Sequence, residues 1–174
     1  MFKEELLNQI LRGNKTQTRR MVKSDTPYDI HMDQDGMAYE IVKTDEDGFE
    51  YDPVRKVKHK YDYDEVVYLK EPWFENEDGS YSYKYNGDCI YDNRWNNKMF
   101  MPERAARGFI KITAVGLERL MDIDNNDAWC EGVSNSPEYD CVALFRSKWE
   151  DINGEESWND NPWVWVYEFE LIKE

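Results

Sequence analysis

Apolar residues recur at helical spacing in three segments of the chain. Residues 2–11 place their apolar side chains on one face, and Gly13 stands where the C-terminal cap of a helix belongs. A short helix is predicted over residues 124–129, because Asp124 can cap its first turn. A third helix is predicted over residues 141–152.

Period-two patterns predict the strands. Residues 16–22 are rich in threonine and end apolar, and residues 66–69 form a continuous apolar run of the buried-strand type. Residues 80–85 alternate tyrosines with polar residues, and residues 109–115 form the clearest strand. Residues 163–172 alternate as a final strand. The apolar side chains expected on one face of that strand are Trp163, Trp165, Tyr167, Phe169 and Leu171.

The segment from about residue 25 to residue 60 is polar and acidic and differs from the rest. Its turn signals are Asp35-Gly36 and Asp47-Gly48, so two hairpins are expected as an elaboration on the core. The strands outnumber the helices, and their connections suit antiparallel pairing. We therefore predict one α+β domain over residues 1–174, built around a curled sheet with an acidic hairpin insertion.

The net charge of the chain limits the classes of binding partner that are expected. The chain has 37 Asp and Glu against 22 Lys and Arg, a formal net charge of -15. Such a field repels polyanions, so duplex DNA and membrane surfaces are not expected partners. No apolar stretch approaches ~20 residues, and three scattered cysteines suit reduced thiols in the cytoplasm. A local patch of Lys15, Arg19 and Arg20 can still hold one or two negative groups, which favours a nucleoside or mononucleotide over long RNA.

No metal or cofactor is expected. The chain has only two histidines, and its cysteines lack zinc spacing. Residues 122–126 begin like a calcium loop, but Asp127 stands where that loop needs glycine and Val133 where it needs glutamate. Phosphate cradles and dinucleotide fingerprints are absent from the sequence.

A basic segment with hydroxyls is the best candidate for chemistry. Thr18 is a weak nucleophile until a base removes its proton, and Lys15 can serve if Arg19 and Arg20 lower its pKa. Glu131 is the candidate acid for a leaving amine. Positions three apart on a regular strand face opposite sides, so these groups converge only if a turn or bulge intervenes. The alternative is a basic edge strand with ordinary surface side chains.

Six motifs follow one another along the chain. They are Gly13-x-Lys15-Thr16-x-Thr18-x-Arg20, Met101-Pro102-x-x-Ala105-x-Arg107, Arg119-Leu120-x-Asp122-Ile123, Asp127-Ala128-x-x-Glu131-Gly132, Trp149-x-x-Ile152-Asn153-Gly154 and Ser157-Trp158-x-x-Asn161-Pro162-Trp163-Val164-Trp165-Val166. In this order they resemble the ASCH domain, a family of the PUA-like superfamily, in the manner of its phage-encoded and prophage-encoded members. Only the segment of about residues 25–60 lacks a counterpart. The resemblance implies a mostly antiparallel PUA-like β-barrel of five or six strands flanked by short helices.

A more distant branch that the chain resembles comprises bacterial N4-acetylcytidine amidohydrolases, which use a lysine, a threonine and a glutamate. Carried over by motif, these roles fall on Lys15, Thr18 and Glu131. In the hydrolase hypothesis for this chain, Arg20 orients the carbonyl or the sugar. The family's Gly-Asp pair before the central strand reads Tyr63-Asp64 here, so the local turn must differ.

Two further residues are substrate-site candidates together with Arg19 and Arg20. Glu71 follows a buried strand and is a candidate partner of Lys15, although an ordinary strand-end glutamate fits as well. Trp73, or alternatively Trp95, lies near loops and is a candidate wall of a nucleobase pocket.

Three functions follow from these features. The first is a hydrolase of an acylated pyrimidine nucleoside. The second is a non-catalytic binder of modified nucleotides or RNA. The third is a phage accessory protein whose acidic surface engages a host protein, in the cytoplasm of the host cell.

Overall fold

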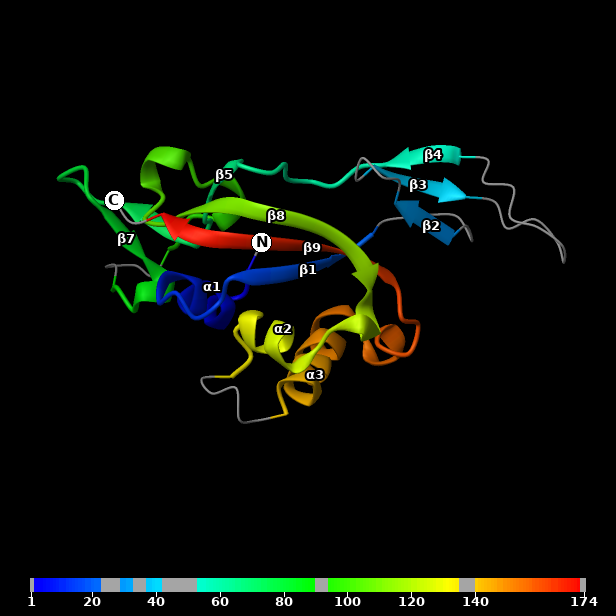
Figure 1. The fold of residues 1–174 in the computed structure, drawn as a ribbon. Coiled ribbons are helices and arrows are strands. Elements are labelled where there is room, and N and C mark those ends of the chain that lie inside the picture. The colour runs from blue at the N-terminus through cyan, green and yellow to red at the C-terminus, as the bar shows by residue number, and fades with distance from the viewer. Residues whose placement is uncertain are drawn as a thin grey trace, which may run out of the picture.

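The computed structural model describes residues 2–22, 29–32, 37–41, 53–89, 94–134 and 140–172. Helices and strands mix in this part of the chain, and short 3-10 turns connect several of them (Figure 1). The α-helices are α1 (Glu4–Leu11), α2 (Asn125–Cys130) and α3 (Cys141–Asn153). The strands are β1 (Gln17–Met21), β2 (Asp29–Met32), β3 (Ala38–Ile41), β4 (Pro53–Val57), β5 (Val66–Tyr68), β6 (Trp73–Glu75), β7 (Tyr81–Tyr83), β8 (Phe109–Arg119) and β9 (Trp163–Ile172).

The main sheet is antiparallel and curled, with the strand order β1-β9-β8-β5. Its two long central strands bow together across the molecule (Figure 1). The pairing of β8 with β9 shifts register between Ile112 and Ala114. The predicted α+β class with a curled antiparallel sheet is confirmed, and the main sheet has four strands among the described residues.

The two faces of the main sheet pack against different partners. On the inner face, Trp165, Tyr167 and Phe169 of β9 belong to one core cluster with Leu7 and Ile10 of α1. On the outer face, the β9 residues at positions 164 and 166 belong to a second cluster, which includes Phe145 and Trp149 of α3. The alternation predicted for the last strand is correct, but its second face is buried as well, because α2 and α3 cover it.

Two smaller sheets extend from the main one. Strands β2, β3 and β4 pair antiparallel in sequence order, and Figure 1 shows them near the C-terminal end of β1. Side chains of this sheet, Ile30, Ala38 and Val57, join the inner core cluster. The two turns predicted in this segment, at residues 35–36 and 47–48, lie outside the described residues. The remaining sheet is the hairpin of β6 and β7.

The predicted helices form close to their predicted bounds. Helix α1 ends at Leu11, and Gly13 follows with φ of 78°, in the left-handed region that favours glycine. The Asp124 side chain accepts a hydrogen bond from the backbone N–H of Asp127 and thereby caps α2. Among the described helices, none has the length and apolar character needed to cross a membrane.

Candidate functional site

Strand β1 directs alternate side chains to opposite faces of the main sheet. Thr18 pairs with Tyr167 and Arg20 with Trp165, so these two β1 residues face the inner side. Gln17 and Arg19 face the outer side, toward α2. The basic segment is therefore divided between two environments.

On the outer side, Lys15 is buried and its ammonium group makes three hydrogen bonds. Its Nζ donates to the backbone oxygen of Gln17 at 2.7 Å, to the backbone oxygen of Glu131 at 2.8 Å and to Glu131 Oε2 at 2.6 Å. Lys15 is 1% exposed and Glu131 4%. Three acceptors match the three N–H donors of an ammonium group, so the contacts suit a charged lysine paired with an ionised glutamate.

Arg19 is enclosed in the same way. Its backbone N–H donates to Glu131 Oε1 at 2.6 Å, and its guanidinium contacts Glu118 Oε1 at 2.6 Å and Asp127 Oδ2 at 2.8 Å. Its Nη1 also donates to the side-chain oxygen of Gln17 at 2.6 Å. We call the set Lys15, Gln17, Arg19, Glu118, Asp127 and Glu131 the ion network.

Local backbone geometry holds the ion network together. Thr16 donates its backbone N–H to the carbonyl of Cys130 at the end of α2, which brings Lys15 beside Glu131. Gly132 follows with φ of 76°, and a Cβ placed there would lie 2.8 Å from the Cβ of Lys15. Only glycine allows the chain to leave α2 this close to Lys15. The turn before β1 thus brings Lys15 and Glu131 together, as the sequence required.

The cations of the ion network do not form the basic patch that the sequence predicted. Burial lowers the pKa of Lys15, and the adjacent carboxylate of Glu131 opposes that shift. The prediction that Lys15, Arg19 and Arg20 form one open basic patch is wrong, because two of the three are buried and paired with carboxylates. Arg20 alone is exposed.

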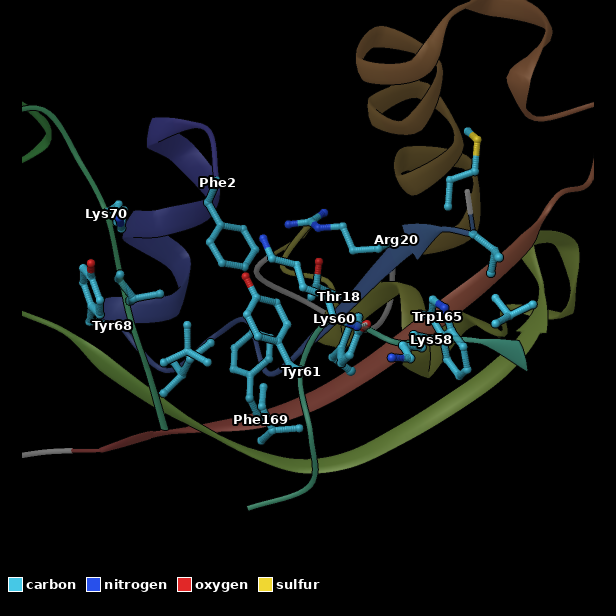
Figure 2. A pocket seen from close by; sticks show the side chains of 18 of the residues that line it. Phe2, Thr18, Arg20, Lys58, Lys60, Tyr61, Tyr68, Lys70, Trp165 and Phe169 are labelled. Carbon is cyan, nitrogen blue, oxygen red and sulfur yellow. Dashed lines mark hydrogen bonds between the residues drawn. The ribbon is translucent and has the colours of Figure 1, made fainter. Parts of the chain in front are cut away.

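On the inner side the main sheet borders a large cavity of about 1180 Å³, which we call the inner cavity (Figure 2). Its walls are mostly apolar and come from β1, β4, β5, β8, β9, the residue Phe2 before α1 and the segment that follows β4. Figure 2 shows Thr18, Arg20 and Lys60 around its centre. Among the apolar residues that line it are Phe2, Tyr61, Tyr68, Ile110, Ile112 and Phe169.

The charged residues along the inner cavity are all cations. No acidic side chain lines it within the described segments. None of its cations forms an ion pair with a carboxylate in the part of the chain that the structure describes. Three of them lie over aromatic rings instead: Arg20 over Phe2, Lys60 over Tyr61 and Lys70 over Tyr68. The cations are Arg20, Lys56, Lys58, Lys60 and Lys70.

Thr18 lies at the boundary between the two environments. It lines the inner cavity and also a small cavity of about 80 Å³, which Lys15 and Glu131 line as well. The Thr18 hydroxyl makes no hydrogen bond with any described residue. The structure therefore brings the three predicted catalytic residues together and leaves one of them, the hydroxyl, unengaged.

Glu71 and Trp73 lie elsewhere. Glu71 is 1% exposed and binds Arg107 through both carboxylate oxygens, at 2.6 and 3.1 Å. Trp73 packs with Met101 and Ala105 in a third core cluster. Neither lines either of the two cavities. The contact predicted between Glu71 and Lys15 is replaced by the pair of Glu71 with Arg107.

Sequence reasoning missed the lysines of the inner cavity. Lys56, Lys58 and Lys60 occupy alternate positions, a period-two signal that was present in the sequence. The signal is hidden because these lysines lie at the end of the segment predicted to be an acidic elaboration. Tyr61 follows them and contributes to the same wall.

Comparison with protein-family models, with curated proteins and with solved structures finds no match for the chain. Within the described segments, no group of three or more His, Cys, Asp or Glu is arranged to hold a metal ion. The case for a function therefore depends on the cavity and the ion network.

Proposed function

We propose that this protein binds a small nucleoside or nucleotide in the inner cavity. The observation that carries the proposal is the combination of apolar and aromatic walls with five cations that lack carboxylate partners among the described residues. A nucleotide presents the complement, a planar ring for the apolar wall and a phosphate for the cations.

The net charge supports a local site over an extended one. At physiological ionic strength the field of a distant surface charge is screened within about 8 Å, so the cavity cations dominate for a ligand inside it. The formal net charge of -15 still repels a long polyanion that must lie across the surface of the protein. A ligand that fits wholly within the cavity avoids this repulsion.

We also propose that the fold is PUA-like and that the chain is a phage-type member of the ASCH family. The curled antiparallel sheet with three flanking helices is compatible with such a barrel. The resemblance of the six motifs provides the specific support.

Titration calorimetry with CMP tests the binding proposal. We expect the Arg20→Ala variant to bind CMP at least about tenfold more weakly, because a hydrogen bond to a charged group is worth about 1.5–3 kcal/mol. Arg12→Ala is the matched control, since Arg12 is exposed at the end of α1 and does not line the cavity. Absence of CMP and cytidine binding to the wild-type protein would refute the proposal.

Hydrolysis of an N4-acylated cytidine is a second candidate, favoured by the unengaged Thr18 hydroxyl beside Lys15 and Glu131. Lys15 and Glu131 form an ion pair in the resting site, and the mechanism requires one proton to pass from Lys15 to Glu131 across their 2.6 Å contact when the substrate binds. Burial, which lowers the pKa of Lys15, assists this transfer. The neutral amine then accepts the Thr18 proton as the threonine oxygen attacks the acyl carbon. Protonated Glu131 returns its proton to the leaving amine, and water hydrolyses the acyl-threonine.

Incubation with N4-acetylcytidine, with release of acetate and cytidine as the readout, tests this chemistry. Thr18→Val keeps the shape of the side chain and removes the hydroxyl, so we expect it to abolish turnover. Turnover that survives in Thr18→Val or in Lys15→Met would exclude this mechanism. Binding of CMP without any turnover by the wild-type protein would favour a non-catalytic binder.

A further inference from the structure

The cations of the inner cavity are unevenly distributed. Figure 2 shows Arg20, Lys58 and Lys60 around Thr18 and Trp165 in one part of the cavity. Phe2, Tyr61 and Tyr68 lie toward α1 and the segment that contains β5. The two parts border each other, since Arg20 lies over the ring of Phe2 and Lys60 over the ring of Tyr61.

The positive charge in the part of the cavity around Thr18 exceeds the negative charge of one phosphate group. Arg20 faces the inner side from β1, and Lys58 and Lys60 come from the segment that follows β4. Three cations without carboxylate partners among the described residues meet there, together with a hydroxyl that has no hydrogen-bond partner among those residues. Charge-assisted hydrogen bonds to phosphate oxygens would use all four groups.

The cavity also has room for more than a mononucleotide. Its volume of about 1180 Å³ exceeds the ~300–1,000 Å³ of ordinary small-molecule sites. The cations held on aromatic rings, such as Lys60 over Tyr61, can exchange a ring face for a phosphate oxygen when a ligand enters.

We infer that the ligand is a nucleoside polyphosphate, a di- or triphosphate whose phosphate chain lies among Arg20, Lys58 and Lys60. The inference deepens the proposed function and rests on it. An apolar, aromatic wall beside three cations fits one nucleoside with a phosphate chain. A strand of nucleic acid would also have to lie across a surface whose net charge of -15 repels it. Since no carboxylate lines the cavity in the described part of the chain, the cations themselves neutralise the phosphates.

Calorimetric titrations with cytidine, CMP, CDP and CTP in a buffer with EDTA test the inference. We expect each added phosphate to tighten binding, with CTP at least about tenfold tighter than CMP. In the Lys58→Ala, Lys60→Ala double variant this ratio should fall toward one. Lys84→Ala, an exposed lysine outside the cavity, should leave the ratio unchanged.

The outcomes separate the two proposals. Equal affinity for CMP, CDP and CTP would overturn the inference and leave nucleotide binding intact. Binding of the dinucleotide CpC more tightly than CDP would also overturn it, in favour of a strand-like ligand. Failure of the whole series to bind would overturn both.

Discussion

The cations on the two sides of β1 have opposite environments. Lys15 and Arg19 are buried in the ion network, where every donor that we describe meets a carboxylate, a carbonyl or an amide oxygen. Arg20 and Lys58 border the inner cavity and have no carboxylate partner among the described residues. In a chain with so many acidic residues, this contrast supports the proposal that one set of cations stabilises the fold and the other binds a ligand.

The two sets of cations also differ in how much each contributes to the free energy of unfolding. Removing one partner of a buried ion pair leaves the other charge uncompensated and costs about 3–5 kcal/mol. An exposed lysine without a partner contributes within about 0.5 kcal/mol. The four predictions below separate the two groups on this basis, beginning with the largest effect.

Lys15→Met should lower the free energy of unfolding by about 3–5 kcal/mol, because Glu131 remains buried without its strongest partner. Urea denaturation followed by tryptophan fluorescence measures the loss. Lys58→Met is the control and should change stability by less than about 0.5 kcal/mol. Combining Lys15→Met with Glu131→Leu should restore part of the loss, and equal losses in the two single variants would contradict the comparison.

Gly132→Ala should destabilise the protein by about 1–3 kcal/mol beyond the strain of its backbone angle, since its Cβ would press on the Cβ of Lys15. Gly79→Ala provides the matched control: Gly79 has φ of 83° and open space around the added Cβ. The control isolates the backbone strain alone, about 1 kcal/mol. Thermal unfolding of both variants gives the difference, and equal melting temperatures would show that the close approach to Lys15 is unimportant.

The Tyr167→Phe variant tests a hydrogen bond on the inner side of the main sheet through the pH dependence of stability. The Tyr167 hydroxyl accepts the backbone N–H of Lys60 at 2.8 Å, so its loss should cost about 1 kcal/mol at neutral pH. Burial raises the pKa of Tyr167 above its usual value near 10. Above about pH 10 the tyrosine hydroxyl ionises in the unfolded chain before it ionises in the folded protein, so the free energy of unfolding of the wild type falls as the pH rises. The variant has no such hydroxyl and does not lose this stability. Denaturation at about pH 8 and about pH 11 should show the difference between the two proteins shrinking.

Salt dependence gives the smallest effect. Binding of CMP should weaken with salt with a slope of log affinity on log salt no steeper than about -1.4, which corresponds to two phosphate contacts. Arg20→Ala should reduce the slope by about 0.7, and Arg12→Ala should leave it unchanged. A much steeper slope with long single-stranded RNA would show that the cations belong to an extended groove. That result would exclude a site confined to the cavity.

Periodicity predicted much of the fold and less of the site. The helices at residues 4–11 and 141–153 and the strands β8 and β9 carry strong apolar patterns, and the structure confirms them. The number of strands in the main sheet depends on pairings between distant segments, which local patterns do not encode.

The site was predictable in part. The proximity of Lys15, Thr18 and Glu131 came from the resemblance, because nothing local links residues so far apart in the sequence. The division of Arg19 from Arg20 follows from strand alternation, but only once β1 is known to have both faces covered. Burial of Arg19 could not be read from its own neighbourhood, since its carboxylate partners come from β8 and α2.

The way β8 accommodates one surplus residue, Thr113, decides the sign of the charge in the inner cavity. Before the register shift, Ile112 opposes Phe169; after it, Leu117 opposes Trp165, so both halves of the strand present aliphatic residues to the same face. A β8 that paired Thr113 in regular register, without the shift, would reverse the parity of every later residue and turn Glu118 inward. The cavity would then contain its own counter-charge, and Arg19 would lose a carboxylate. Deletion of Thr113 would instead remove the surplus residue and leave Leu117 inward and Glu118 outward, so the register shift itself keeps this carboxylate out of the cavity.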